Sequence, residues 1–298
     1  MLLLLTLHDS SASPAGWLSV SGFVVEPFGV FLGAGLLLAV LLATRLADRV
    51  GLLRARGASL FVAAGAGALP AARGLYVLSN GVHESGWQAL AFGVGGLSGY
   101  GALLGAVAGA LWVSRRWRPE ARGSWFDCAA PGVVLAAATA RLGCFLSGCD
   151  FGVTLGARAP RWLARLGTFE RGAPDALRPV WLEQLQAGQI SANSLESLPS
   201  HPTQLYEAIL LLAFSVYLMR RIQLRTWAGQ IFAQAVLGYA VIRGALELLR
   251  ADADRGRLVG ISVTSWCALL TAAWALSALW RRRARLADSA QSPPELPR

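Results

Sequence analysis

The residues with the clearest chemical potential are arginines and carboxylates that interrupt apolar stretches. Arg73 falls in one such stretch and Arg141 in another, while a third carries Arg243, Glu247 and Arg250. The last three are spaced i, i+4 and i+7, so on one continuous helix they would share a face. Charged groups inside a membrane are costly and are therefore functional candidates. Guanidinium groups from three separate stretches suit a single phosphate group, whereas Arg243 and Glu247 alone suit a structural ion pair equally well.

Polar residues also gather where a linking segment enters another apolar stretch, in the order His201-Pro202-Thr203-Gln204-Leu205-Tyr206-Glu207. Proline favours the first helical position, which predicts His201 as the residue that caps this helix. Gln204 and Glu207 then follow on one face, at a helix start that favours anions. A lone histidine is more often a structural hydrogen-bonding residue than a catalyst. The convergence of His201, Gln204 and Glu207 nevertheless indicates part of a site.

The four cysteines divide into two kinds. Cys128 and Cys267 lie in apolar stretches and are most simply core residues. Cys144 and Cys149 lie near the outer face, where a disulfide could form, but their five-residue spacing in a helix would place them on different faces. Zinc needs more ligands than this segment supplies, so we predict no metal. We expect two free thiols that line a pocket.

The elements that must position these residues are apolar segments long enough to cross a bilayer, which takes about 20 residues per helix. The chain has 298 residues, of which 55% are hydrophobic and only 15% charged. This composition excludes a disordered chain and most soluble enzymes. We predict an all-α polytopic membrane protein with about seven transmembrane helices, in the windows 22–44, 58–79, 89–113, 128–149, 203–219, 228–249 and 258–280.

The arginines predict the orientation of these spans. The formal charge is +10 and every basic residue is arginine. Arginines cluster after the first, third, fifth and seventh spans, which places the N-terminus outside and the C-terminus in the cytoplasm. Nucleic-acid binding is therefore not expected. Residues 1–285 form a single membrane domain in this prediction, with a small extracytoplasmic cap at 150–200, and residues 286–298 form a disordered cytoplasmic tail.

Taken together, the motifs resemble the prolipoprotein diacylglyceryl transferase family of bacterial membranes. The run from His201 to Glu207 is similar to the family's His-Pro-Ser-Gln-Leu-Tyr-Glu segment, with Thr203 in place of the serine. The segment after Arg141 resembles the signature Gly-Arg-x-Gly-Asn-Phe-x-Asn-Gly-Glu-x-x-Gly. Two further segments also resemble the family, namely Arg73-Gly74-Leu75-Tyr76 and Gly238-Tyr239 with Arg243, Glu247 and Arg250.

The resemblance implies an enzyme of the bacterial cytoplasmic (inner) membrane that needs no cofactor. It would move a diacylglyceryl group from phosphatidylglycerol, or a similar anionic phospholipid, to the thiol of a lipoprotein-precursor cysteine, forming a thioether. Arg141 and Arg243 would then bind the phosphate, Glu247 would orient Arg243, and His201, with Glu207, would accept the thiol proton. The remaining residues expected to bind lipid or substrate are Arg73, Tyr76, Tyr100, Cys144, Cys149, Gly152, Gln204, Tyr206 and Arg250.

The chain also departs from the family's pattern. Tyr100 stands where the family has a histidine before paired glycines. Cys144 and Ser147 replace the two asparagines of the signature, and Cys149 replaces its glutamate, with Asp150 one residue later. The arginine framework is kept while the polar lining is changed. Two alternatives remain open: a paralogue with different lipid or acyl-transfer chemistry, and a non-catalytic membrane protein that binds a phospholipid or a lipoprotein precursor.

Overall fold

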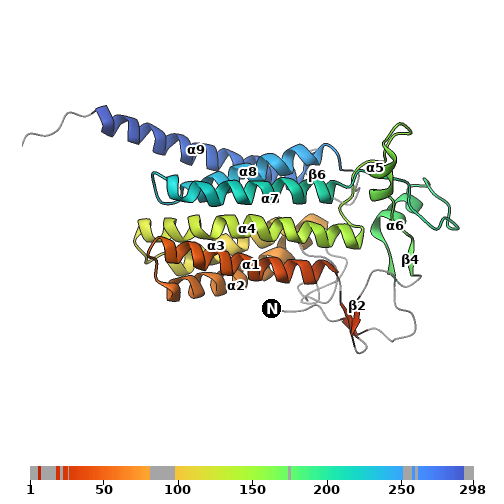
Figure 1. Ribbon diagram of the computed structural model, residues 1–298, viewed down its shortest axis with the longest axis horizontal. Helices are drawn as coiled ribbons and strands as arrows, with labels where there is room; N and C mark the ends of the chain where they lie inside the picture. Colours follow the sequence, from red (N-terminus) through yellow and green to blue (C-terminus); the bar gives the residue numbers. More distant parts are fainter. Residues whose placement is uncertain are drawn as a thin grey trace, which may run out of the picture.

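The computed structural model describes residues 6–7, 18–20, 23–25, 27–80, 98–173, 176–250, 257–258 and 261–291. Within these residues the chain is almost entirely helical, and its long helices run side by side as a bundle (Figure 1). The long helices are α1 (Pro27–Arg49), α2 (Arg54–Asn80), α3 (Gly99–Ser114), α4 (Pro119–Ser147), α7 (Thr203–Arg221), α8 (Gln230–Glu247) and α9 (Val263–Gln291). Each corresponds to one of the seven predicted windows.

The shorter elements lie between and before these helices. The segment between α4 and α7 forms a head at one end of the bundle (Figure 1). This head carries α5 (Arg161–Leu166), α6 (Pro179–Gln186) and a hairpin of β4 (Gly172–Ala173) and β5 (Ala176–Leu177). Three short antiparallel strands precede α1, in the order β1 (Thr6–Leu7), β3 (Phe23–Val25) and β2 (Leu18–Val20). A second hairpin, β6 (Arg257–Leu258) with β7 (Ile261–Ser262), leads into α9, and the turn η2 (Ile222–Leu224) follows α7.

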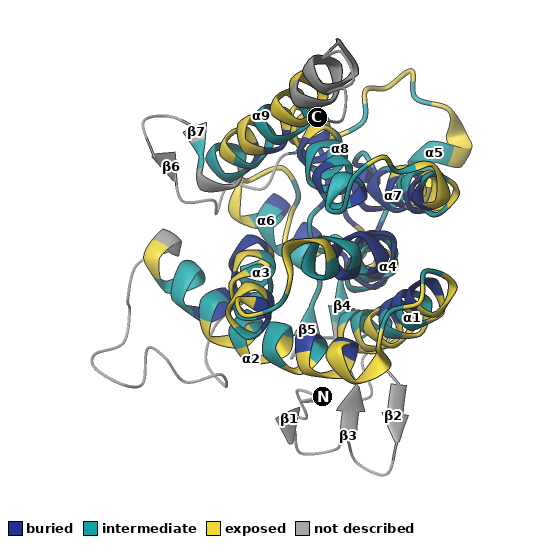
Figure 2. Ribbon diagram, turned by 90° about the vertical axis from the view of Figure 1, so that its left-hand side faces the viewer, coloured by how far each residue is buried: buried dark blue, intermediate teal, exposed yellow. Residues whose placement is uncertain are grey.

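Helix α4 is the central element of the bundle. It packs against α1, α7 and α8, and its buried residues face these neighbours (Figure 2). The core around it includes Trp125, which is fully buried, together with Leu211 and Leu218 from α7 and Ile231 from α8. A site on the inner face of α4 is therefore surrounded by other helices.

Small residues allow neighbouring helices to approach closely, as is usual where helices associate in lipid. A Cβ atom at Gly67 of α2 or at Gly105 of α3 would collide with the backbone of the opposite helix. In the same way, a Cβ atom at Gly132 of α4 would meet the backbone of Ala39 in α1 at 2.7–3.1 Å. These contacts hold α3 on α2 and α1 on α4.

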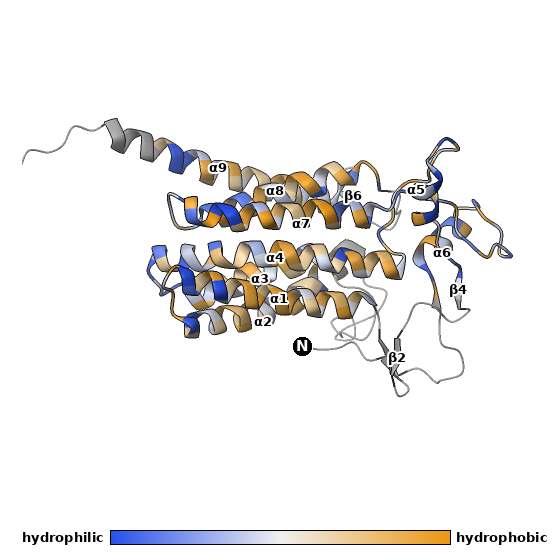
Figure 3. Cartoon of the chain, in the orientation of Figure 1, coloured by the Kyte–Doolittle hydropathy of each residue, from blue (hydrophilic) through white to orange (hydrophobic). Residues whose placement is uncertain are grey.

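Three of the described helices have the length and composition of membrane-spanning helices. In the described part of the chain, the segments Pro27–Arg49, Arg54–Leu78 and Pro119–Ser147 are long and apolar enough to cross a membrane, and Gly99–Ser114 is a shorter apolar helix. Apolar residues dominate the middle of the bundle, and hydrophilic residues concentrate at its ends and in the head (Figure 3). The prediction of a helical membrane protein is confirmed, whereas the number of seven spans stays a prediction.

Several predicted boundaries differ from the structure; α4, for example, begins at Pro119 instead of residue 128. The first span begins at Pro27 instead of residue 22, because Phe23–Val25 forms strand β3 and pairs with β1 and β2. Helix α9 continues through Gln291, beyond the boundary predicted at residue 285 for the disordered tail. Residues 292–298 of that tail lie outside the described residues.

Candidate functional site

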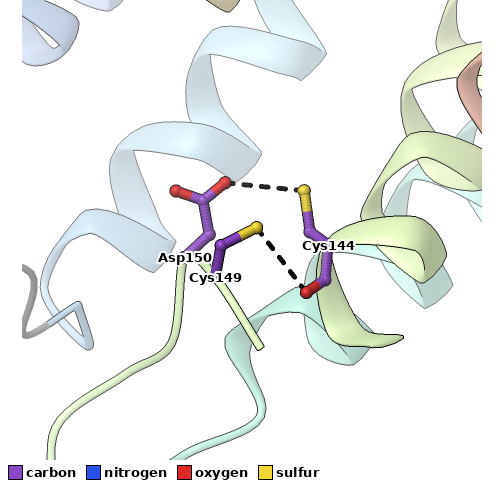
Figure 4. Close-up of side chains that lie close together, drawn as sticks. All are labelled: Cys144, Cys149 and Asp150. Carbon is purple, nitrogen blue, oxygen red and sulfur yellow. Dashed lines mark hydrogen bonds between the residues drawn. The ribbon is translucent and has the colours of Figure 1, made fainter. Parts of the chain in front are cut away.

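The end of helix α4 creates the local geometry of the candidate site. The helix stops at Ser147 because Gly148 adopts a left-handed conformation (φ 72°) and its N–H donates back to the carbonyls of Cys144 and Phe145. Asp150, two residues later, is also left-handed (φ 61°), which is uncommon outside glycine but tolerated by aspartate. The chain therefore folds back, and Asp150 lies beside Cys144 of the last helical turn (Figure 4).

Asp150 joins two of the predicted arginines. One carboxylate oxygen of Asp150 accepts from Arg141 of α4, and the other accepts from Arg250, which follows α8. Arg141 also binds Glu207 of α7, with 3.0 Å between Nε and Oε2. The structure thus assembles one largely buried network of charges from α4, α7 and the chain after α8.

Arg243 extends this network on helix α8. It is buried, pairs with Glu247 at 2.9 Å, and interacts electrostatically with Arg141, Arg250 and Glu207. The predicted i, i+4 ion pair is confirmed. The prediction that Arg250 shares this helix face is wrong, because α8 ends at Glu247 and Arg250 turns toward Asp150.

Backbone hydrogen bonds fix the segments that carry these charges. Gly152 pairs with Arg250 in a β-bridge, and its N–H donates to the carbonyl of His201 at 2.9 Å. Val153 donates to Leu249 at 2.8 Å and accepts from His201 at 2.9 Å. A Cβ atom at Gly152 would lie 2.6 Å from the Leu249 carbonyl oxygen, so this position requires glycine. Gly152 therefore has a structural role next to the charged network.

The start of α7 carries the second group of predicted residues. The helix begins at Thr203 with Pro202 as its cap, so the prediction that His201 caps it is wrong. The reason is that the backbone of His201 is held by Val153 and Gly152. The Thr203 hydroxyl donates to the Asp150 carbonyl at 2.8 Å, and Gln204 Nε2 donates to the Cys149 carbonyl at 2.6 Å. These bonds attach the fold-back segment to α7.

His201 and Glu207 have different surroundings. His201 is half-buried, and its Nδ1 lies 3.3 Å from the Tyr206 hydroxyl. Glu207 is only 2% exposed, and its second oxygen, Oε1, has no hydrogen-bond partner among the described residues. Since a buried acceptor without a partner is costly, Glu207 Oε1 is a position where a ligand or a proton would be stabilised.

Three predicted residues lie on helices α2 and α3. Arg73 is buried, with its guanidinium 5.5 Å from the centre of the Tyr76 ring. Tyr100 packs edge-on against Tyr239 of α8 with 6.1 Å between ring centroids, and its hydroxyl is buried without a hydrogen-bond partner in the described part of the chain. The Tyr100 side chain interacts electrostatically with Arg243 and Glu207, so α3 also borders the network.

The two thiols are free, as predicted, but they are not on different helix faces. Cys149 lies beyond the helix end, and the ligand atoms of Cys144, Cys149 and Asp150 are all within 4.8 Å of one another (Figure 4). A hydrogen bond to Cys144 and burial raise the pKa of the Cys149 thiol well above its ordinary value. Both Asp150 oxygens are already paired with arginines. A neutral thiol and two adjacent guanidinium groups disfavour a metal cation here.

Two residues of this site were not among the predicted ones. Asp150 follows the helix end and has the only positive φ angle among the non-glycine residues described. The signal for it in the sequence was the acid placed one residue after the position of the family's glutamate. Tyr239 lies within hydrogen-bonding and electrostatic reach of Arg141. Its only signal was its place in the Gly238-Tyr239 pair.

Fold and site together define a helical membrane protein with a buried network of arginines and carboxylates next to its head. Residues 16–281 match the family model described as prolipoprotein diacylglyceryl transferase. The chain belongs to this family.

Individual relatives carry the same description. A phosphatidylglycerol–prolipoprotein diacylglyceryl transferase of Bacillus cereus (strain B4264) is 29% identical over 241 residues, which cover 77% of this chain and 78% of the relative. The protein of the same description from Geobacillus kaustophilus (strain HTA426) is 31% identical over 240 residues, or 76% of each chain.

Proposed function

We propose that this chain transfers a diacylglyceryl group from phosphatidylglycerol to the cysteine thiol of a lipoprotein precursor. The single observation that carries the proposal is the position of Arg141, which is shared between Asp150 and Glu207 in the interior beside the head. The names of the relatives describe this reaction for those proteins. The chemistry requires a phosphate site and a proton acceptor close together, and the network offers both.

The bond changes follow from the substrates. The acceptor sulfur attacks the glycerol carbon that carries the phosphate, a C–S bond forms, and the C–O bond to the phosphate breaks. Glycerol phosphate leaves with the electron pair, and the thiol proton goes to a base. The phosphate therefore gains one negative charge in the step, while the base gains one proton.

We assign the proton to Glu207. Its Oε1 has no partner among the described residues, and its Oε2 pairs with Arg141. Once Glu207 is protonated, the positive charge of Arg141 is less compensated and becomes available to the departing phosphate. Proton uptake and leaving-group stabilisation are coupled in this way through one guanidinium. His201, the other candidate, contacts Tyr206 instead and serves in this proposal to position the segment at the start of α7.

The other predicted residues take supporting roles in the proposal. Arg243 binds the phosphate together with Arg141, and Glu247 orients Arg243 through their 2.9 Å ion pair. Glu247 is itself held by the Ser262 hydroxyl at 2.8 Å. Arg73 supports the phosphate from α2. The lipid- and substrate-binding assignments stay as predicted for Tyr76, Tyr100, Cys144, Cys149, Gln204, Tyr206 and Arg250, whereas Gly152 has the structural role described above.

The proposed topology is a single membrane domain of seven spans in the bacterial cytoplasmic membrane. The arginine-rich ends of α1, α7 and α9 lie at the end of the bundle opposite the head (Figure 1). By the positive-inside rule, that end faces the cytoplasm and the head at 150–200 faces outward. The reaction would then occur near the outer leaflet, where the precursor peptide is accessible.

The acyl-transfer alternative is less favoured at Cys149. It would require Cys144 or Cys149 to act as a nucleophile and carry a thioester. The raised pKa of Cys149 keeps that thiol neutral, whereas the thiolate is the nucleophilic form. A neutral thiol at Cys149 therefore weighs against this residue as the nucleophile of an acyl-transfer reaction.

The test is complementation of a bacterial strain depleted of its own transferase, scored by lipoprotein maturation. The wild-type chain should restore maturation, and Glu207→Gln should reduce it at least about 100-fold, as expected for loss of an acid–base group. Glu120→Gln is the matched control, because Glu120 is exposed in the first turn of α4. A wild-type chain that is present in the membrane but restores nothing would overturn the proposal and leave two alternatives, a paralogue with a different substrate and a non-catalytic lipid-binding protein.

A further inference from the structure

We propose that Cys144 and Cys149 form a disulfide when a disulfide oxidant reaches the head end of the bundle, and that this cross-link holds Asp150 at the charged network. The structure describes the pair in its reduced state, with both thiols free. Such an oxidant is expected on the outer side of the bacterial cytoplasmic membrane. The disulfide therefore depends on the proposed outward orientation of the head, but not on the transfer reaction.

The end of helix α4 brings the two thiols together. The Gly148 N–H donates to the Phe145 carbonyl at 3.2 Å, and the Cys149 N–H donates to the Cys144 carbonyl, also at 3.2 Å. With Gly148 in the left-handed conformation, these two bonds define a Schellman motif. In this motif the residues at the positions of Cys144 and Cys149 commonly touch through apolar side chains. Here both side chains are thiols.

The sulfur atoms are already neighbours in the reduced state. The Cys149 Sγ lies 3.6 Å from the Cys144 carbonyl oxygen, and the two Sγ atoms are within 4.8 Å of each other (Figure 4). A backbone hydrogen bond also joins the same two residues. We therefore expect the S–S bond, which is about 2.05 Å long, to need only local movement of two short side chains.

One bond accounts for two departures from the family's pattern. Cys144 stands in the position of an asparagine and Cys149 in that of a glutamate. Each replacement alone removes a polar group, whereas the two together place sulfur at both contact positions of the helix cap. The other cysteines are placed differently. Cys128 belongs to the core around Trp125, and Cys267 packs in a separate cluster.

The oxidation balances with a disulfide oxidant, such as a small disulfide or a thiol–disulfide oxidoreductase. Cys149 is the entry point, because it is half-buried while Cys144 is only 4% exposed. The Cys149 sulfur loses its proton, bonds to one oxidant sulfur and releases the other as a thiol. The Cys144 sulfur then loses its proton and attacks the Cys149 sulfur, which releases the second oxidant thiol. The two cysteines lose two protons and two electrons, and the oxidant gains them.

The disulfide should form slowly and then resist reduction. The hydrogen bond to Cys144 and burial raise the pKa of the Cys149 thiol, which lowers the fraction of thiolate that starts the exchange. The same property makes the Cys149 sulfur a poor leaving group when another thiol attacks the finished bond. The cross-link is therefore expected to persist once it has formed.

The cross-link would limit how far Asp150 can move. Asp150 directly follows Cys149, and hydrogen bonds from Thr203 and Gln204 attach this segment to α7. These bonds can open one at a time, whereas a covalent bond to the last turn of α4 stays closed. Oxidation would thus keep the Asp150 carboxylate beside Arg141, with which it pairs.

The test maps the thiols by mass spectrometry. Purified protein is incubated with oxidised glutathione and then unfolded in N-ethylmaleimide without reductant, so that slow reaction of the folded Cys149 no longer protects it. Trypsin cleaves after Arg141 and Arg158, which leaves both thiols on the peptide 142–158. This peptide should carry no label and be lighter than the reduced peptide by two hydrogen atoms, while Cys128 and Cys267 are labelled. Protein labelled directly at cell lysis should give the same pattern.

The matched control is Cys149→Ser, in which Cys144 should be fully labelled under the same conditions. Hydrogen exchange of the peptide 142–158 provides a second readout: reductant should speed its exchange in the wild-type protein but not in Cys149→Ser. Labelling of both cysteines in the wild-type protein would overturn the proposal, as would a blocked Cys144 in the variant or exchange that reductant does not change. Neither readout uses lipid transfer, so failure of the proposed function would leave both results unaffected.

Discussion

The replacement Asp150→Asn tests whether the network around Asp150 joins the helices energetically. Asp150 binds Arg141 of α4 and Arg250 after α8, and its backbone carbonyl accepts from Thr203 of α7. Asparagine is well suited to the left-handed conformation at this position (φ 61°), so the replacement removes the charge without straining the backbone.

The size of the effect follows from burial. Removing one partner of a fully buried ion pair costs about 3–5 kcal/mol, whereas exposed pairs contribute about 0–1 kcal/mol. The side chains of Arg250, Arg141 and Asp150 are 4%, 17% and 32% exposed, which lies between these limits. For the two pairs together we expect a loss of about 2–4 kcal/mol in the free energy of unfolding.

The assay is denaturant unfolding in detergent micelles, followed by the fluorescence of the 11 tryptophans. Asp48→Asn is the matched control, because Asp48 pairs with Arg54 at 2.6 Å but the two side chains are 36% and 76% exposed. This control should lose little stability, because solvent screens an exposed ion pair. If both variants unfold with the same free energy, the network around Asp150 does not stabilise the bundle.

Three further predictions concern neighbouring features. Gly152→Ala should destabilise the protein by about 1–3 kcal/mol in the same unfolding assay, because its Cβ would lie 2.6 Å from the Leu249 carbonyl oxygen. The control Gly156→Ala should have little effect, because a Cβ atom there meets nothing within 4 Å. Asp127→Asn should lower the free energy of unfolding by about 2–4 kcal/mol, since this buried carboxylate binds Arg225, Gly229 and Phe232. The transfer rate per folded molecule should stay unchanged, because these contacts lie around the α7–α8 connection, far from the head. A lower rate per folded molecule would contradict this. Cys149 in the folded protein should react with N-ethylmaleimide far more slowly than a free thiol at roughly pH 8, because its raised pKa keeps it protonated; peptide mapping that finds rapid labelling would show this to be wrong.

The sequence predicted the helices and the arginine framework because both depend on strong local signals. Long apolar runs indicate helices in lipid, and the positions of Arg141 and Arg243 inside such runs mark them as unusual. The structure confirms the helical bundle and the Arg243–Glu247 pair, which needed only helical spacing. The pairing of Arg141 with Glu207 is a contact between α4 and α7, and no local pattern specifies it.

The fold-back after α4 could not be predicted from the local pattern. The spacing of Cys144 and Cys149 was interpreted as continuous helix, whereas Gly148 ends the helix with a left-handed residue. Asp150 becomes important only because the turn carries it toward Arg141 and because Arg250 leaves its helix to meet it. Likewise, His201 does not cap α7, because its backbone pairs with Val153, nearly fifty residues away.

The most direct test of the proposed diacylglyceryl transfer is the mass of an acceptor peptide incubated with the purified protein in phosphatidylglycerol vesicles. The peptide should gain one diacylglyceryl group on its cysteine, in a linkage that resists hydroxylamine, as a thioether does. Replacing Arg141 or Arg243 with alanine should abolish the product. A hydroxylamine-sensitive adduct, or full activity in both arginine variants, would show that this site does not transfer a diacylglyceryl group to a thiol.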